Sequence, residues 1–392
     1  MPLTGPFTRN GMDARDGWQT YMASINNSVA GRQIQTIVVD DVETQPDAAL
    51  AKAKQLVEDQ KVNVLAGIVA TPVCYAVASY VKQAQVPLMV AADCAAQDLT
   101  TNEKYVSPYL TRFTTINSAQ SDTAADWAIG AGYKKAIVMT LDYGAGIESS
   151  DLFASAFIAR GGTVVQELHP PLGTNDYGPY LAQMTTDADL LANFIPGADG
   201  LKFGQQYKNY LGQRKLQILD IGAGSTSGTN FTQLGDQTIG MIAEAFYSQA
   251  YDAPANQAFI KQWKDKNPNN PISEEVADGY VTAQAFAAAV QKVNGNIEDK
   301  QAFLNALYAT DIDSPRGHLK LDDRHDIIEA NFMYQIVSGS NGPAEKMLKT
   351  YENVSQFWDR TPEQMLKLAP GSKKGTWVGM TKAKMGDLVK VS

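Results

Sequence analysis

The sequence predicts an α/β protein built from two doubly wound lobes, each a parallel β-sheet covered by helices. Through the first 115 residues, apolar runs of strand length alternate with amphipathic runs of helix length, and the alternation restarts near residue 119. Parallel strands need a crossover between them, so this order is typical of a parallel sheet with helices on both faces. With 392 residues, the chain is long enough for two or three such domains.

The first series of elements follows from hydrophobic periodicity. We expect helices at 11–27, 47–60 and 73–84, and strands at 33–39, 63–69 and 86–91. The chain opens on Met1-Pro2-Leu3-Thr4-Gly5-Pro6-Phe7, which looks like the end of a first strand. We therefore expect that a leader and part of that strand precede Met1.

The second series of elements shows the same alternation of helices and strands. We expect helices at 119–131, 148–160, 199–211, 256–266 and 274–293, and strands at 135–140, 163–165, 188–195, 216–221, 240–246, 318–321 and 331–337. The last residues are rich in Lys, Gly and Pro, which indicates a tail that wraps the surface.

Residues 134–165 are the most informative segment, because they read as strand, turn, helix and strand. Asp142-Tyr143-Gly144 falls in the turn, after the apolar strand 136–140 and before the helix. In open α/β sheets, small ligands bind at the edge where strands end and helices begin. Tyr143 is therefore a candidate ligand contact.

Composition excludes several classes of function. The net charge of −9 argues against nucleic acid or anionic lipid as the main partner. No phosphate-binding glycine loop, GxSxG, HExxH or CxxC motif is present, so we expect no cofactor, no metal and no catalytic residues. Three scattered histidines and two cysteines give no metal-ligand spacing.

The two cysteines leave two alternatives open. Cys74 and Cys94 each follow an apolar strand, so both can lie at the same sheet edge. They form a disulfide if the compartment is oxidising, or remain two separate buried thiols.

Small residues follow five of the expected strands and give the candidate ligand loops. The five candidate loops begin at Ala70, Asp93, Asp142, Pro196 and Gly222. Small residues at helix N-termini leave backbone N–H groups open to an anionic group such as a carboxylate. Arg316 lies in a turn before a strand. It is a candidate cation for a ligand, but a solvent-exposed side chain is the more common outcome in such a turn.

Several segments, in this order and spacing, resemble one known family. They are 2–7, Ala30-Gly31-Arg32-Gln33-Ile34, Asp40-Asp41, Pro46-Asp47, Val86-Pro87, Ser107-Pro108-Tyr109, Arg112-Phe113, 142–146, Gly161-Gly162-Thr163-Val164-Val165, Ser314-Pro315-Arg316-Gly317 and Val354-Ser355-Gln356-Phe357-Trp358. The chain resembles periplasmic substrate-binding proteins of ABC importers, of the branched-chain-amino-acid-receptor type, over nearly its whole length.

The resemblance implies two lobes joined by three crossings, with the ligand clamped between them. The expected lobes are 1–115 with 251–328, and 116–250 with 329–358, followed by a tail at 359–392. Carried over residue by residue, ligand contacts come from Asn10, Ala70, Thr71, Asp93, Cys94, Ala95, Ala96, Tyr143, Pro196, Gly197, Gly222 and Val276. Asn10 is expected in the loop after the first strand. The family further implies a periplasmic, non-enzymatic monomer that delivers its ligand to a membrane permease.

Departures from the family pattern bear on the ligand. Amino-acid receptors of this type carry a serine and a threonine where this chain aligns Ala70 and Ala96, and an acidic residue near Gly222, which we expect to be absent here. A buried ammonium without an anionic partner costs several kcal/mol. The whole chain is most similar to members that bind aromatic acids such as benzoate or cinnamate derivatives. The alternatives are branched-chain or other aliphatic amino acids or amides, with Asp93 as a partner for an amine. An α/β enzyme or a sensory ligand-binding domain is a more distant alternative.

Overall fold

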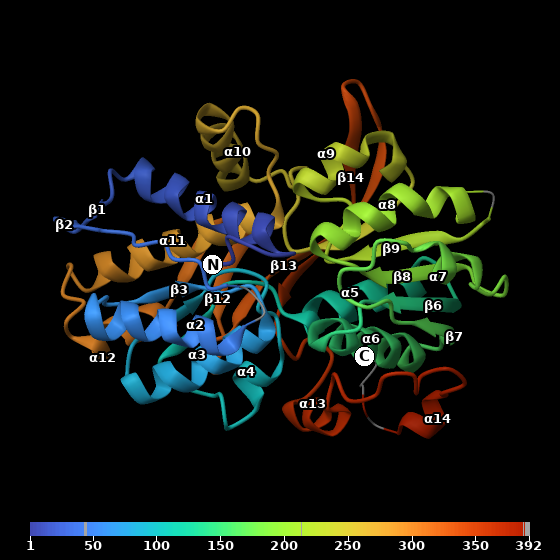
Figure 1. Cartoon of the computed structure of the whole chain (residues 1–392), viewed down its shortest axis with the longest axis horizontal. Helices are drawn as coiled ribbons and strands as arrows, with labels where there is room; N and C mark the ends of the chain where they lie inside the picture. Colours follow the sequence, from blue (N-terminus) through green and yellow to red (C-terminus); the bar gives the residue numbers. More distant parts are fainter. Residues whose placement is uncertain (43–44, 213, 387, 389–392) are drawn as a thin grey trace. The chain divides into compact units, whose positions relative to one another are not determined.

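The computed structural model describes residues 1–42, 45–212, 214–386 and 388 (Figure 1). The chain divides into two compact units. Unit 1 comprises Met1–Ile116 and Tyr251–Ala330, and unit 2 comprises Asn117–Ala250 and the chain from Asn331 onward. The chain therefore passes between the units three times. Within the described ranges, no helix is long and apolar enough to cross a membrane.

Unit 1 contains a parallel sheet in the order β3 (Leu65–Gly67), β4 (Leu88–Val90) and β5 (Leu110–Arg112). Figure 1 shows α2 (Pro46–Lys54) and α3 (Thr71–Ala84) on one side of this sheet, and α1 (Thr8–Ser24) and α11 (Glu274–Lys292) on the other. A π-helical turn (Gln55–Asp59) extends α2. Apolar side chains of α2 and α3 form one core with those of the strands, as the sequence predicts.

Unit 1 contains further helices and strands. They are β1 (Ser28–Val29), β2 (Arg32–Gln33), α4 (Asp98–Thr101), α10 (Pro254–Lys266), α12 (Lys300–Tyr308), β11 (Asp311–Ser314), β12 (Gly317–Leu321) and the start of β13 (Ile327–Gly339). Strands β11, β12 and β13 pair antiparallel.

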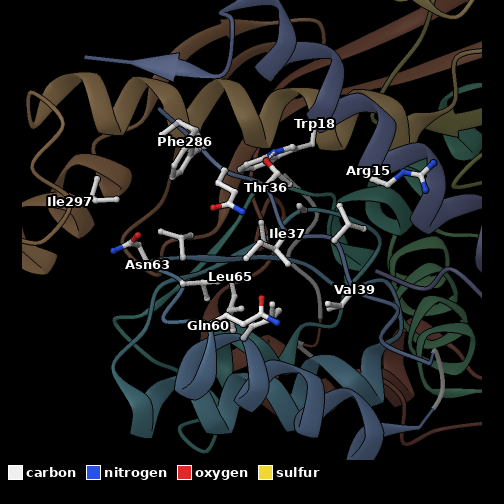
Figure 2. A pocket seen from close by; sticks show the side chains of 18 of the residues that line it. Arg15, Trp18, Thr36, Ile37, Val39, Gln60, Asn63, Leu65, Phe286 and Ile297 are labelled. Atoms are coloured by element: carbon white, nitrogen blue, oxygen red, sulfur yellow. Dashed lines mark hydrogen bonds between the residues drawn. The ribbon is translucent and has the colours of Figure 1, made fainter. Parts of the chain in front are cut away.

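The predicted strand 33–39 is wrong for most of its length. Only Gln33 belongs to a strand, in the small β1–β2 hairpin, and residues 34–39 form neither helix nor strand. The local sequence Ile-Gln-Thr-Ile-Val-Val has high β-propensity, but a strand also needs a neighbour with which to pair. The described chain places a cavity, and no strand, beside this segment (Figure 2).

Unit 2 is a doubly wound sheet. Five parallel strands follow in the order β7 (Thr163–Leu168), β6 (Lys135–Thr140), β8 (Leu190–Phe194), β9 (Gln217–Ile221) and β10 (Ile242–Ala245). Antiparallel β13 pairs with β10, and β14 (Gly342–Val354) pairs with β13. The predicted α/β class with parallel-sheet lobes is confirmed.

Helices cover both faces of this sheet (Figure 1). One face carries α5 (Asn117–Gly130) and α6 (Gly144–Ala159), and the other carries α7 (Gly178–Ala182), α8 (Gly197–Leu211) and α9 (Gly228–Leu234), which a 3-10 turn (Gly235–Thr238) follows. The apolar core beneath α7 and α8 joins Leu181 and Phe203 to the strand residues Ile137 and Leu191.

The end of the chain is anchored in unit 2 by buried side chains. It contains α13 (Pro362–Leu368) and α14 (Lys382–Met385). Arg360 donates to both Asp122 carboxylate oxygens, at 2.9 and 2.6 Å. The buried Trp377 indole donates to Asp151 Oδ1 at 2.7 Å. These contacts make the segment a packed part of unit 2.

Candidate ligand-binding site

The crossing of α1 and α11 in unit 1 depends on two glycines. A Cβ at Gly279 would lie 1.8 Å from the backbone oxygen of Ala14, and a Cβ at Gly17 would lie 2.0 Å from that of Val276. The two helix backbones are therefore in contact. This approach brings Asn10 on α1 next to the first turn of α11. The sequence placed Asn10 in a loop, and the structure corrects this, since α1 begins at Thr8.

Asn10 links two acidic side chains. Its amide nitrogen donates to Asp93 Oδ2 at 2.9 Å and to Glu275 Oε1 at 2.5 Å. Burial raises the pKa of Asp93 well above its ordinary value, and the negative charges of Glu275 and Asp278 raise it further. Burial and the neighbouring carboxylates thus both disfavour the charged form of Asp93 relative to an exposed aspartate.

The N-cap of α11 extends the same cluster. Ser273 Oγ accepts from the backbone N–H of Val276 at 3.3 Å and donates to Asp13 Oδ2 at 2.8 Å. Burial and the nearby Glu275 charge raise the pKa of Asp13 to about 7. The first turn of α11 and the middle of α1 are thus joined by hydrogen bonds.

Asp13 makes the stability of unit 1 depend on pH. Its pKa is about 7 in the fold and about 4 in an unfolded chain, so its stabilising contribution is complete below about pH 4. That contribution is lost as pH rises through 7. We expect Asp13→Asn to keep the Ser273 hydrogen bond and to raise the melting temperature relative to the native chain at pH 8, but not at pH 4.

Thermal unfolding at both pH values measures this difference. Asp265→Asn, at an exposed position on α10, controls for the loss of one negative charge. If Asp13→Asn changed the melting temperature by the same amount at both pH values, Asp13 would not be the source of the pH dependence.

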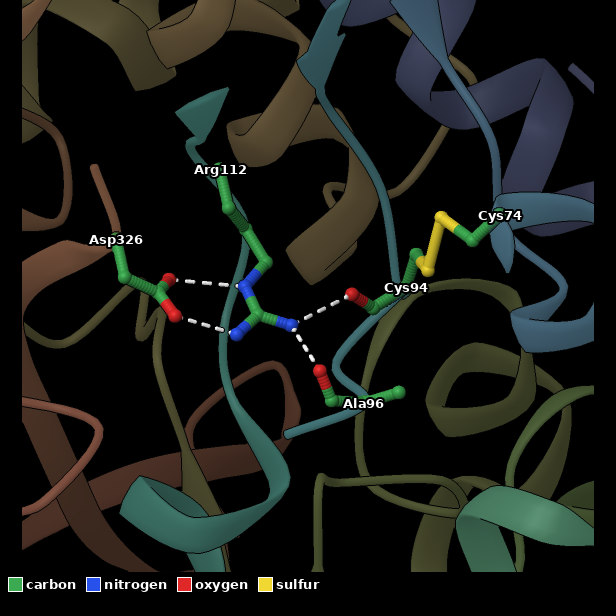
Figure 3. Close-up of a disulfide and its surroundings, with 5 residues drawn as sticks. All are labelled: Cys74, Cys94, Ala96, Arg112 and Asp326. Atoms are coloured by element: carbon green, nitrogen blue, oxygen red, sulfur yellow. Dashed lines mark hydrogen bonds and ion pairs between the residues drawn. A yellow bond between two sulfur atoms is a disulfide. The ribbon is translucent and has the colours of Figure 1, made fainter. Parts of the chain in front are cut away.

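The loop after β4 is held by a disulfide and a buried arginine (Figure 3). Cys74 on α3 is bonded to Cys94, so the alternative of two free thiols is excluded. Arg112 Nη1 donates to the backbone oxygens of Cys94 at 3.1 Å and Ala96 at 2.7 Å. Its other nitrogens bind the Asp326 carboxylate, and both side chains are fully buried.

These contacts fix the backbone of Asp93–Ala96 beside the N-terminus of α3, where Ala70 is the N-cap and Thr71 the first residue. The carboxyl ends of β3 and β4 meet at this edge. Hence the eight unit 1 residues predicted for the site lie in adjoining loops and helix ends.

Arg316 is not exposed, contrary to the sequence expectation. It is fully buried, forms ion pairs with Asp278 and Glu329, and donates to the backbone oxygen of Phe113 at 2.8 Å. Two buried carboxylates require a cation, and this is why the turn between β11 and β12 points inward. Arg316 therefore has a structural role in unit 1.

In unit 2, the predicted residues lie at the carboxyl ends of the parallel strands. Tyr143 is the N-cap of α6 and Pro196 is the N-cap of α8. Gly197 and Gly222 adopt positive φ of 64° and 68°, a conformation that favours glycine. A Cβ at Gly222 would lie 3.2 Å from both the Gln120 amide and the Phe194 ring.

An acidic side chain does lie near Gly222, contrary to the sequence expectation. The carboxylate is Glu244 on β10, whose Oε2 accepts from the Gly222 N–H at 3.4 Å. Its Oε1 accepts from Asn331 Nδ2 at 2.7 Å. It was missed because it belongs to the neighbouring strand rather than to the loop. A signal existed, since a glutamate in the apolar strand Ile-Ala-Glu-Ala is unusual.

Asp220 and Asn193 are further buried polar residues within apolar strands. Asn193 Nδ2 donates to Asp220 Oδ1 at 2.9 Å, and Asp220 Oδ2 accepts from Ser225 N–H at 2.8 Å and Thr226 Oγ1 at 3.0 Å. Burial raises the pKa of Asp220 to about 6 although these hydrogen bonds lower it. This network holds the loop 222–226 in place. Sequence reasoning missed these residues, together with Glu275 and Asp13.

Comparisons with known proteins agree with this architecture. The profile of the periplasmic binding protein family matches residues 1–342. A Leu/Ile/Val-binding protein homolog 6 from Brucella melitensis biotype 1 is 28% identical over 358 residues, which cover 90% of each chain.

Two known structures superpose over most of the chain. An ABC transporter substrate-binding protein from Sphaerobacter thermophilus has a TM-score of 0.85 and 26% identity, covering 91% of this chain and 97% of that one. A solute binding protein of an ABC transporter from Rhodopseudomonas palustris BisB5, in complex with 3,4-dihydroxy benzoic acid, has a TM-score of 0.83 and 26% identity, covering 90% of this chain and 96% of that one.

The family match and these two structures place the chain in the class of ABC-transporter solute-binding proteins, which bind small solutes and deliver them to a permease. The chain belongs to the periplasmic binding protein family. The resemblance identified from the sequence is confirmed, and the family places the protein outside the cytoplasm.

Proposed function

We propose that this solute-binding protein takes up an aromatic carboxylate of the benzoate or cinnamate type. The observation that carries the proposal is the likeness, over 90% of this chain, to the Rhodopseudomonas palustris protein in complex with 3,4-dihydroxy benzoic acid. Two features of the chain support it. Ala70 and Ala96 present no hydroxyl for an amino-acid carboxylate, and the apolar ring of Phe194 lies beside Gly222.

In this proposal the two units are lobes that close on the ligand, and the ligand-contacting residues are the twelve named from the sequence. Backbone N–H groups at the N-termini of α3, α6 and α8 are suited to a carboxylate. Binding uses no covalent step, so the protein is not an enzyme. The closed form is presented, as a monomer, to a membrane permease on the periplasmic side.

A second candidate is an aliphatic amino acid. It is favoured by the Glu244 carboxylate beside Gly222, and by the Leu/Ile/Val-binding homolog from Brucella. A carboxylate at this position can pair with an α-ammonium group. In this case Glu244→Gln would abolish binding, whereas an aromatic carboxylate needs no anion there.

The test is a thermal-shift screen with benzoate, 4-hydroxybenzoate, cinnamate, leucine, isoleucine, valine and simple amides. A ligand that binds only the folded state stabilises it by RT ln(1 + L/Kd) at free ligand concentration L, so the melting temperature rises with the ligand concentration. We expect at least one aromatic acid to raise the melting temperature. Calorimetric titration then measures the dissociation constant of that acid. Stabilisation by leucine or valine alone would reject the aromatic-acid proposal in favour of the second candidate.

Tyr143→Ala is expected to weaken binding of the stabilising ligand at least tenfold, about 1.4 kcal/mol. The side chain is half-buried at the N-terminus of α6, where a ring wall or hydroxyl can contact a solute. Calorimetric titration measures the change. The control is Tyr210→Ala, an exposed tyrosine at the far end of α8. If the two variants bind equally well, Tyr143 is not part of the site.

A further inference from the structure

A segment between α13 and α14 passes beside α6 in unit 2 (Figure 1). It comprises residues 371–377, here called the strap, and it lies beyond the residues that the family profile matches. Residues 371–377 form neither helix nor strand. The conformation of the strap therefore depends on the side chains that hold it.

Asp151 on α6 holds both ends of the strap. Its Oδ2 accepts from the N–H groups of Gly371 at 2.8 Å and Lys373 at 3.0 Å. Its Oδ1 accepts from the indole of Trp377 at 2.7 Å, and the Trp377 side chain is buried. Burial raises the pKa of Asp151, whereas these three donors lower it. The strap thus compensates part of the cost of burying this carboxylate.

Glu167 on β7 holds the second half of the strap. Its Oε1 accepts from the Gly375 N–H at 3.2 Å, and its Oε2 accepts from the Trp377 N–H at 2.8 Å. Lys374 lies between Lys373 and Gly375, whose N–H groups are both bound to carboxylates. Because the backbone on both sides of Lys374 is already ordered, an ion pair of this lysine costs less entropy than one in an unanchored loop.

The strap contacts the residues on both sides of Tyr143. Lys374 Nζ lies 2.5 Å from Asp142 Oδ2, and both side chains are about half exposed. A Cβ at Gly371 would lie 4.0 Å from Gly144 O, so the strap backbone also lies against the first residue of α6. Tyr143, the N-cap of α6, is therefore flanked by two contacts with the strap.

Backbone contacts fix the other side of the same loop. Asp142 N–H donates to Pro170 O at 2.7 Å, and Tyr143 N–H donates to Leu141 O at 2.9 Å. A Cβ at Gly146 would lie 2.0 Å from Leu141 O, so the first turn of α6 packs directly on the end of β6. The loop that carries Tyr143 is thus held between the sheet and the strap.

We propose that the strap positions Tyr143 for the ligand, with Lys374 as the positioning residue. The proposal rests on the proposed function, in which Tyr143 contacts the solute. Lys374 acts through Asp142 and does not touch the ligand. Without the ion pair, the peptide between Asp142 and Tyr143 moves more freely, and ligand binding must order it again. Exposed ion pairs change an equilibrium by at most about fivefold, which sets the scale of the effect.

A positioning role differs in sign from a long-range effect of charge. Lys374 and Asp142 carry opposite charges, so an effect of charge alone changes the affinity for an aromatic carboxylate in opposite directions when each charge is removed. If the pair positions the loop, removal of either charge weakens binding. The second removal then adds nothing to the first.

The experiment compares Lys374→Met, Asp142→Asn and the double variant with the native chain. Calorimetric titration with 4-hydroxybenzoate measures the dissociation constants. Lys374→Arg keeps a cation at the position of the ion pair. Lys382→Met removes an exposed lysine of α14 and controls for the loss of one positive charge.

A second measurement needs no ligand. Amide hydrogen exchange of the free protein is followed at Asp142, Tyr143 and Ile147, whose N–H groups are hydrogen-bonded in the loop and the first turn of α6. The amides of β8 serve as the internal reference for the rest of unit 2. A local opening of the loop accelerates exchange at the three amides only.

We expect Lys374→Met and Asp142→Asn each to weaken binding about three- to fivefold. The double variant should bind no more weakly than either single variant, and Lys374→Arg and Lys382→Met should bind like the native chain. Exchange at the three amides should accelerate at least about threefold in Lys374→Met and Asp142→Asn, while β8 keeps its native rates.

Three outcomes would overturn the proposal. The first is tighter binding by Asp142→Asn than by the native chain, since charge alone would then explain the result. The second is a loss in the double variant equal to the product of the two single losses. The third is native exchange at the three amides in Lys374→Met. The exchange measurement decides between a held and an independent loop even if no aromatic acid binds, in which case the ligand screen rejects the proposed function separately.

Discussion

Gly279→Ala should unfold unit 1 or cost at least about 3 kcal/mol of its stability. The added Cβ would lie 1.8 Å from Ala14 O and 2.9 Å from Trp18 N. Both atoms belong to the backbone of α1, so no side-chain rotation can relieve the overlap. The two helices must separate, and Asn10 must move away from Glu275. Urea unfolding followed by circular dichroism measures the loss.

The matched control is Gly130→Ala, at an exposed position in α5. No atom lies within 4 Å of a Cβ there. Alanine in a helix restricts the unfolded chain more than glycine does, so this variant should gain about 0.5–1 kcal/mol. A Gly279→Ala protein as stable as the control would mean that α1 and α11 are not in backbone contact.

Arg112→Met should cost about 3–5 kcal/mol, because it leaves the buried Asp326 carboxylate without its cation. It also removes the two hydrogen bonds to Cys94 O and Ala96 O that hold the predicted ligand loop. We therefore expect weaker ligand binding even at temperatures where the variant is folded. Chemical denaturation and calorimetric titration measure the two effects separately.

Two further variants test whether the loss of the Arg112 guanidinium causes both effects. Adding Asp326→Asn to Arg112→Met should recover part of the stability but not the affinity, since the loop still lacks its donor. Arg32→Met removes an arginine that pairs with Glu298 at the surface, where both side chains are about half exposed, and should change neither quantity measurably. A native-like Arg112→Met protein would show that the buried pair is dispensable.

The parallel framework could be predicted because its signals are local. Strand β6 occupies residues 135–140 as expected, since an apolar run of strand length between two helices has few other solutions. The prediction of a strand at 33–39 was wrong because a strand needs a neighbouring strand to pair with, and the local sequence does not show whether one is present. Strand β14 was not predicted, since its lysines, glutamates and glycine have low β-propensity and most of them are exposed.

Side-chain partners could be predicted less well than backbone positions. That strands end near Ala70, Asp93, Tyr143, Pro196 and Gly222 follows from apolar runs giving way to small residues. Glu244 lies 22 positions from Gly222 in the sequence, and the two carboxylates around Arg316 lie 38 and 13 positions from it. Such contacts depend on the tertiary fold, and hydrophobic periodicity along the sequence does not predict them.

The ion pair between Arg112 and Asp326 joins residues 214 positions apart, across the whole inserted segment of unit 2. At ~5–20 residues per second on a ribosome, about 10–40 s separate the synthesis of the two partners. During that time the nascent chain holds a guanidinium whose buried partner does not yet exist. Unit 1 is therefore completed only after most of the polypeptide has been translated. The buried ion pair of unit 1 is therefore among the last contacts of that unit that can form during synthesis.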